Sequence, residues 1–428
     1  MKRARLGMAM AFTLLGLAAC TPTPTPTAVP PTMPPPTPTV TQALPTLPPL
    51  PVETLIPPPL FEGPPTFTVC ASGCDFPRVQ DAVDAASAEG GAIIEVRDAT
   101  HTEAGITIDK DVTIRGADAD RTTIQAHVVL GEASDRVFLV EAGATAVLQH
   151  LSIRHGAALQ GEHGGGILNH GTLTVLACIV THNTAHGGAG INSDGTLNVI
   201  NSTICHNTAD DAGPLGHQCG SGGGLKSTSG TLTVVNSVIH DNQAGLRSSG
   251  TAGGVRVGCQ ASAVLVNSTI SGNRSVNYGA GLVAIGPVRV INCTICDNHT
   301  PREAGGIYIR GRLDMQNTLI ANNHSGTAEC YISGSGGYQG RGQIGLNENN
   351  WVSDGSCGAS FSGDPQLGPL ADNGGPTWTR ALLPESEAVD AVSASACSLP
   401  TDQRGLPRPA SATGSAVRCD IGAYERQP

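Results

Sequence analysis

A motif recurs six times between Gly166 and Asn323 and constrains the fold more than any other feature of this chain. Each copy contains a glycine pair, a short aliphatic stretch, an Asn-Ser-Thr-Ile-like segment and a closing asparagine. The closing asparagines are spaced by 24, 35, 31, 25 and 25 residues, at Asn183, Asn207, Asn242, Asn273, Asn298 and Asn323. A fainter earlier copy runs from Leu148 to Gly156. Repeats of this size indicate a solenoid, in which stacked units share one core.

The apolar residues within each copy alternate, as in Leu197 and Val199 or Leu232 and Val234. A period of two predicts β-strands, because a helical repeat would space its apolar residues at about 3.6. Val, Ile and Thr dominate these segments, and Gly and Asn interrupt them where bends are expected. We therefore predict three short strands per coil, each paired in parallel with its equivalent about 4.8 Å away. The longer spacings predict loop insertions at 210–221 and 244–250.

Residues 67–145 are expected to form the N-terminal cap and first coils. A short helix is predicted from apolar positions at Val79, Ala82, Val83 and Ala86, and it would cover the open end of the stack. Strands are predicted at 92–96, 106–108, 112–114 and 123–124. The segments 79–86, 108–116 and 122–124 resemble the first coils of pectin lyase-like and pectin methylesterase-like proteins. This resemblance implies an all-β, right-handed, single-stranded parallel β-helix, with its repeat coils at 146–330.

The C-terminal segment, 331–428, contains three further motifs. They are Ala-Asp-Asn-Gly-Gly-Pro-Thr at 371–377, Thr-Asp-Gln-Arg-Gly at 401–405 and Cys-Asp-Ile-Gly-Ala-Tyr-Glu at 419–425. Together they resemble the choice-of-anchor Q module found in bacterial surface β-helix proteins. Trp378 is expected to belong to the core of this module.

The N-terminus predicts export. Residues 1–20 have a basic start and a short apolar run, and they end in Leu-Ala-Ala-Cys, which resembles a bacterial lipobox and implies lipidation of Cys20. Residues 21–66 form a Thr/Pro-rich tract that predicts a disordered stalk, about 140 Å long if fully extended at ~3.1 Å per residue. The protein is thus expected to be exported and lipid-anchored at the bacterial cell surface, with the membrane as a partner through its lipid.

Thirteen cysteines in an exported protein predict disulfide bonds. The candidate pairs, which are close in sequence, are Cys330 with Cys357, Cys397 with Cys419, and Cys205 with Cys219. Cys178 and Cys293 fall at equivalent positions four coils apart, about 19 Å at ~4.8 Å per coil, which is too far for a bond. Cys293 and Cys296 lie along one strand, and we interpret them as core residues.

One set of residues has the chemistry of a metal site. The positions just before the closing asparagines carry His182, His206 and Asp241, and the fainter copy places His155 there. If these residues stack in a column, three imidazoles and a carboxylate could bind Zn²⁺ or a similar divalent metal. The alternative is a structural ladder, in which these side chains bond neighbouring backbone. No other cofactor is predicted.

The sequence disfavours some functions. A formal charge of −11 without a basic cluster argues against nucleic acid as a partner. Of the hydrolase motifs of the β-helix group only an Asp-Asp pair is present, at Asp210 and Asp211. The candidate lyase bases, which show no aligned acidic cluster, are Arg256, Arg289, Arg310 and Arg312. We expect a non-catalytic surface for adhesion, display or contact with an extracellular polysaccharide or another cell-surface ligand. The alternatives are a polysaccharide lyase or glycoside hydrolase, and a purely structural envelope role.

Overall fold

The computed structural model describes residues 63–87, 90–158, 161–210, 221–245, 250–334, 341–410 and 417–428. All of these residues belong to one compact unit, Leu47–Pro428. The predicted signal peptide, Cys20, nearly all of the stalk, Cys219, Asp211 and most of both predicted loop insertions lie outside the described residues. Within the described ranges, no helix is long and apolar enough to cross a membrane.

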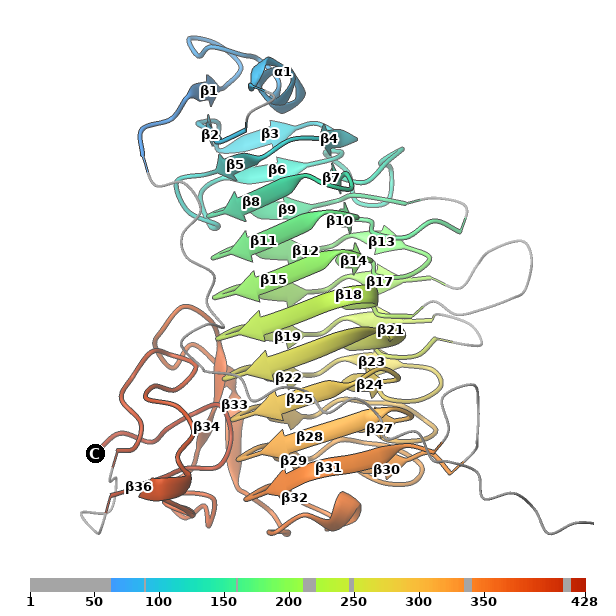
Figure 1. The fold of residues 1–428 in the computed structure, drawn as a ribbon, viewed down its shortest axis with the longest axis vertical. Helices are drawn as coiled ribbons and strands as arrows, with labels where there is room; N and C mark the ends of the chain where they lie inside the picture. The colour runs from blue at the N-terminus through green and yellow to red at the C-terminus, as the bar shows by residue number, and fades with distance from the viewer. Residues whose placement is uncertain are drawn as a thin grey trace, which may run out of the picture. The chain divides into compact units, whose positions relative to one another are not determined.

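The described chain is a stack of β-strand coils with a short helix, α1 (Val79–Ala85), at its N-terminal end (Figure 1). The fold-class prediction is confirmed: the protein is an all-β parallel β-helix. Equivalent strands of successive coils pair in parallel, and the pairing of Leu173 with Leu197 and of Leu197 with Leu232 reproduces the register of the sequence repeats.

Three parallel sheets form the walls of the solenoid, and we call them sheets A, B and C. Sheet A has two strand positions per coil, which merge in the long strands β18 (Leu225–Val235) and β21 (Val255–Val266). Its first position contains β4 (Ile106–Ile108), β7 (Phe138–Val140), β10 (Ile167–Asn169), β14 (Ile191–Ser193), β24 (Leu282–Ala284), β27 (Ile307–Ile309) and β30 (Cys330–Ile332). Its second position contains β1 (Phe67–Val69), β2 (Ala92–Val96), β5 (Val112–Arg115), β8 (Thr145–Gln149), β11 (Thr172–Leu176), β15 (Thr196–Ile200), β25 (Val288–Ile291), β28 (Arg312–Gln316) and β31 (Gln343–Glu348).

Sheet B has one strand per coil: β3 (Thr100–Thr102), β6 (Thr123–Gln125), β9 (Ser152–Arg154), β12 (Ile179–Thr181), β16 (Thr203–Cys205), β19 (Val238–His240), β22 (Thr269–Ser271), β26 (Thr294–Cys296), β29 (Leu319–Ala321) and β32 (Trp351–Val352). Sheet C is short and contains β13 (Thr184–Ala185), β17 (Thr208–Ala209), β20 (Gln243–Ala244) and β23 (Arg274–Ser275). The central coils therefore have four strand positions. The prediction of three was wrong because the two-residue strands of sheet C are too short to show an alternating pattern.

A ladder of buried asparagines joins six coils. The side-chain amide of each closing asparagine donates to the side-chain oxygen of the next, at 2.8–3.0 Å, from Asn183 to Asn323. The last amide, that of Asn323, donates to the Glu329 carboxylate at 2.6 Å. A ladder of this kind satisfies polar groups at a bend where water is excluded, and so stabilises the predicted stacking.

Two bends per coil have left-handed backbone conformation. The first-bend column consists of His150, Ala177, Asn201, Asn236, Asn267, Asn292, Asn317 and Asn349, all with positive φ. The second-bend column consists of His155, His182, His206, Asp241, Gly272, Asp297 and Asn322, also with positive φ. Apart from Ala177, these residue types are the ones that enter this region most readily. Sheet B lies between the two columns.

The C-terminal segment folds back beside the lower coils (Figure 1). It contains two antiparallel pairs, β33 (Leu367–Ala371) with β34 (Thr379–Leu382) and β35 (Val392–Ser393) with β36 (Arg418–Cys419). The parallel stack itself continues through β31 and β32 to Val352. The boundary predicted at residue 330 is therefore one coil too early, because this last coil lacks the glycine pair and closing asparagine of the repeat.

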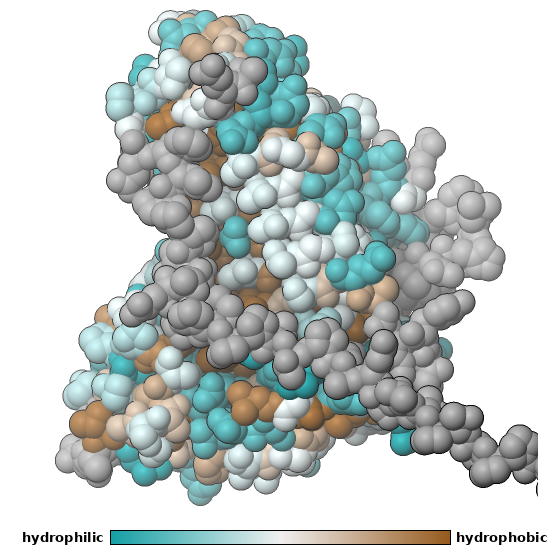
Figure 2. Space-filling view, viewed as in Figure 1, coloured by the Kyte–Doolittle hydropathy of each residue, from teal (hydrophilic) through white to brown (hydrophobic). Residues whose placement is uncertain are grey.

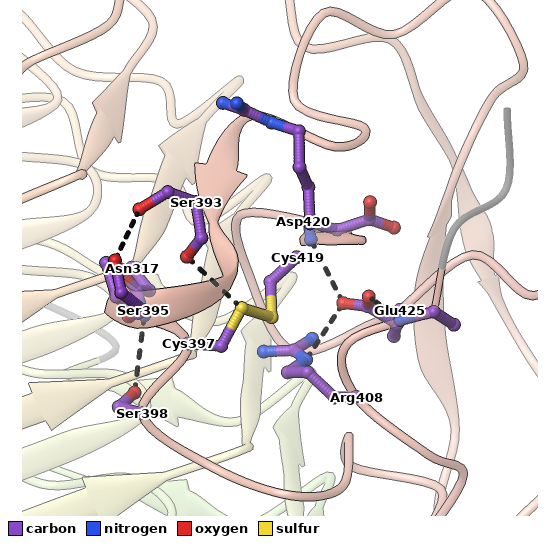
Figure 3. The surroundings of a disulfide bond; sticks show 12 residues. Asn317, Ser393, Ser395, Cys397, Ser398, Arg408, Cys419, Asp420 and Glu425 are labelled. Atoms are coloured by element: carbon purple, nitrogen blue, oxygen red, sulfur yellow. Dashed lines mark hydrogen bonds and ion pairs between the residues drawn. A yellow bond between two sulfur atoms is a disulfide. The ribbon is translucent and has the colours of Figure 1, made fainter. Parts of the chain in front are cut away.

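Disulfide bonds fasten the C-terminal part of the chain. Cys330–Cys357 ties the last coils together, and Cys397–Cys419 lies within the folded-back segment (Figure 3). Near the second bond, the buried Arg408 guanidinium lies 3.0 Å from the Glu425 carboxylate. A third bond, Cys70–Cys74, was not predicted. Cys205 is a buried free thiol, and so are the predicted core cysteines Cys178, Cys293 and Cys296.

Candidate functional site

A cleft opens on the outer face of sheet B, above the coils that the C-terminal segment covers. Its volume is about 690 Å³. Its floor includes Ile179 of β12 and Thr203 of β16. One end is formed by Asp118 and Asp120, in the turn after β5, and the other by Trp378, just before β34.

The C-terminal segment determines where this cleft ends. On the lower coils it covers sheet B through buried hydrogen bonds, such as Thr269 to Gln403 at 2.7 Å and the backbone N–H of Ala423 to Thr294 at 3.0 Å. Arg380 forms an ion pair with Asp297 of the second-bend column. On the coils that precede β19, Ile179 and Thr203 are partly exposed.

Trp378 closes the lower end of the cleft. Its indole is 49% exposed, and it stacks on the imidazole of His240, with ring centroids 5.9 Å apart and planes inclined by 20°. The prediction that Trp378 belongs to the core of the C-terminal module is wrong. The fold-back presents this side chain to the cleft instead, a long-range placement that the local sequence does not encode.

Histidine rings continue upward from Trp378 along the edge of the cleft. Ring centroids are 5.7 Å apart for His240 and His206, 5.1 Å for His206 and His182, and 6.4 Å for His182 and His155. The predicted column therefore exists as a spatial row. His182 and His206 are exposed. His155 is half-buried, and its Nδ1 donates to the backbone carbonyl of His127 at 3.0 Å.

The closest cluster of ligand atoms is not the one that the sequence predicts. His206, His240 and Asp241 each offer one ligand atom, and these atoms lie within 4.8 Å of one another. His155 and His182 lie outside this trio. His240 was missed because it occupies a strand position, in register with Cys205 and Ser271, and does not belong to the second-bend column. The signal in the sequence was the His-Asp pair directly before the closing Asn242.

Electrostatics distinguish these histidines. Burial alone would lower the pKa of His240, but hydrogen bonds to Asp241 and Cys205 raise it to about 9. The Asp241 carboxylate lies 2.8 Å from Nδ1 of His240, and this hydrogen bond lowers the pKa of Asp241. Desolvation, followed by the neighbouring His206 and His155, lowers the pKa of His182. Without a ligand, the His240–Asp241 pair is an imidazolium–carboxylate ion pair at neutral pH.

Basic residues on sheet A form a separate group. Lys226 and Arg256 are register partners on β18 and β21, and Nζ of Lys226 lies 3.4 Å from Nε2 of His163. Burial, with a smaller effect of Lys226, lowers the pKa of His163 to about 4. His163 is therefore neutral at physiological pH.

Two of the candidate arginines share one acidic neighbour, which on its own is not an acidic cluster. The buried carboxylate of Asp314 lies 3.0 Å from Arg312 and 3.6 Å from Arg289. The side chains converge because residues 289 and 314 are register partners on adjacent coils. A single buried carboxylate held by two guanidiniums is a structural ion pair.

Comparisons with known proteins find no match among protein families or curated proteins. Among solved structures, the pectate lyase Pel9A aligns with 82% of this chain and 91% of that chain, at 12% identity and a TM-score of 0.45. A structure titled Geobacillus virus E2 ORF18 aligns with 63% of this chain at 15% identity and a TM-score of 0.36, and this chain spans 56% of its length.

Proposed function

We propose that this protein is a lipid-anchored component of the bacterial cell surface whose cleft on sheet B binds a polysaccharide without cleaving it. The observation that carries the proposal is the half-exposed Trp378 at the end of an open cleft that is lined by both apolar and polar side chains. An exposed indole offers a flat apolar face for the C–H face of a sugar ring, while polar groups beside it select hydroxyl positions.

The groups beside Trp378 suit a neutral saccharide. Asn201 and Thr203 line the cleft and can hydrogen-bond sugar hydroxyls, and Asp118, Asp120 and Asp241 can accept such bonds. The carboxylates of Asp118 and Asp120 would repel an acidic polymer, whereas that of Asp241 is paired with His240. On the face shown in Figure 2, where the strands of sheet A lie in front, the surface of the upper coils is mostly pale or teal.

A lipid anchor at the cell surface would suit a protein that contacts a polysaccharide there better than one that acts while diffusing freely. The basic start, apolar run and Leu-Ala-Ala-Cys of residues 1–20 support lipidation at Cys20, and the tract that follows supports a stalk. A Cys20→Ser variant that remained in the membrane fraction would contradict the anchor.

Binding is tested with the purified protein by affinity electrophoresis in gels that contain neutral or acidic polysaccharides. We expect retardation by at least one neutral polymer, and about tenfold weaker binding for Trp378→Ala, because loss of one stacking platform removes roughly 1.4 kcal/mol. The matched control is Trp351→Phe, because this second tryptophan is buried in β32, in the last coil, and does not line the cleft.

Two results would count against the proposal. Equal retardation of Trp378→Ala and the parent would remove the indole from the site. Release of reducing ends or unsaturated sugars by the parent protein would replace a binding role with the enzymatic alternative.

A further inference from the structure

We propose that His206, His240 and Asp241 form a binding site for a divalent transition-metal ion, at the edge of the cleft. This inference does not depend on saccharide binding. It begins from the spatial cluster: three side chains from two adjacent coils place one ligand atom each within 4.8 Å of one another.

Local backbone geometry aims these side chains at one another. His206 and Asp241 occupy successive positions of the second-bend column, with φ of 54° and 51°. His240 directly precedes Asp241, at the end of β19. The strand end and the bend of one coil therefore supply two ligands, and the bend of the coil above supplies the third.

Two neighbours hold this arrangement in place. The Trp378 indole stacks on His240, whose residue is only 6% exposed. On the next coil the column contains Gly272, where an added Cβ would lie 2.7 Å from Oδ1 of Asp241. The absence of a side chain at Gly272 thus leaves room for the Asp241 carboxylate.

The ligand types indicate the class of metal. Two imidazoles and one carboxylate suit Zn²⁺, Co²⁺, Ni²⁺ or Cu²⁺, whereas Ca²⁺ and Mg²⁺ prefer sites made of oxygen ligands. Tetrahedral ligands bonded at about 2.0–2.1 Å lie roughly 3.3–3.5 Å apart, so shifts of about 1 Å would bring the three atoms into coordination. His240 and Asp241 share a hydrogen bond, so binding of the ion would release the proton that joins them to solvent. The partly exposed Asp241 and exposed His206 leave the ion open to the cleft, where water can complete its coordination.

Metal binding is tested by titrating the full chain with Co²⁺ and Zn²⁺ in the absence of saccharide. In this experiment the parent protein carries two substitutions. Cys259→Ser removes an exposed thiol, and Trp351→Phe leaves Trp378 as the only tryptophan. We expect saturable binding of one ion per chain by calorimetry. Quenching of Trp378 fluorescence by Co²⁺ should follow the same isotherm, because the indole stacks on a ligand.

Variants then separate the trio from the longer histidine row. His206→Gln and Asp241→Asn should each weaken binding about 100-fold, because each removes one of three protein ligands. His206 is exposed, so His206→Gln is expected to keep the parent's melting temperature. Asp241→Asn also changes the hydrogen bond to the buried His240, and a His240→Gln change would mix packing with coordination, so His206→Gln is the decisive variant. The control, His155→Gln, removes a histidine of the same row and should bind as the parent does.

Three results would overturn the proposal. They are the absence of saturable binding of Co²⁺ and Zn²⁺ to the parent, equal affinity in the parent and His206→Gln, and a loss in His155→Gln as large as that in His206→Gln. The last result would favour the full column over the trio. Preferential binding of Ca²⁺ would contradict the assigned class of metal.

Discussion

Replacement of one asparagine in the middle of the buried ladder should destabilise the solenoid far more than replacement of an asparagine at the first bend. The Asn242 amide donates to Ile204 O at 2.8 Å, to His240 O at 3.0 Å and to Asn273 Oδ1 at 3.0 Å. Its own side-chain oxygen accepts from the backbone and side-chain nitrogens of Asn207, at 3.1 and 3.0 Å. Asn242→Ala removes all five interactions.

The expected loss in free energy of unfolding follows from burial. Asn242 is completely buried, so the groups that lose it do not regain water. With roughly 1 kcal/mol for each lost bond and more where a backbone group stays unsatisfied, we expect a loss of about 4–6 kcal/mol. The control, Asn201→Ala, changes a half-exposed bend residue with φ of 49° and should lose only about 1 kcal/mol of backbone preference.

Urea unfolding followed by far-UV circular dichroism measures both variants, with the midpoint as the readout because a repeat protein need not unfold in two states. If Asn242→Ala shifts the midpoint no more than Asn201→Ala does, the ladder contributes little beyond what water would provide, and the energetic reasoning is refuted.

Three further predictions concern stability. Folding lowers the pKa of His163 to about 4, so its contribution to the free energy of unfolding is present above pH ~6.5 and is lost as the pH falls toward 4. After allowance for partial exposure, the loss is about 1–2 kcal/mol. A His163→Gln variant whose melting temperature depends on pH as the parent's does would contradict this prediction. Cys330→Ser removes the disulfide bond between Cys330 and Cys357, which are 27 residues apart, and should lower the free energy of unfolding in urea by about 3–4 kcal/mol. An unchanged urea midpoint would show that this bond does not stabilise the fold. Gln403→Ala removes the buried hydrogen bond from Thr269 and should accelerate proteolysis of the C-terminal segment severalfold, whereas a rate equal to that of the parent would mean that other contacts suffice.

The sequence predicted the repeating part of the fold because each coil restates the same pattern. Inward aliphatics such as Leu197 and Leu232 and the closing asparagines have local signals, and the structure reproduces their spacing as register. Sheet C was not predicted, because strands such as Thr208–Ala209 are two residues long and show no alternating pattern. Aligned repeats also placed His182 and His206 in one column, as observed.

The cleft depends on contacts that no repeat alignment contains. Trp378 contacts His240 only because the C-terminal segment turns back along sheet B. The two residues are far apart in the sequence, so no local pattern predicts their contact. His240 differs from the column histidines because its coil places it on a strand, next to the bend residue Asp241. Alignment by bend position alone therefore identified Asp241 beside His206 but did not identify His240.

The folded-back segment contacts a defined set of coils at the C-terminal end of the solenoid. Its contacts begin at Asn236, whose carbonyl accepts from Thr377, and continue to the last coil through the packing of Ile421 with Trp351. A coil duplicated above that level would leave every one of these contacts intact and would lengthen the open face by about 4.8 Å. The length of the open face can thus change by whole repeats, with the indole at its lower boundary unchanged.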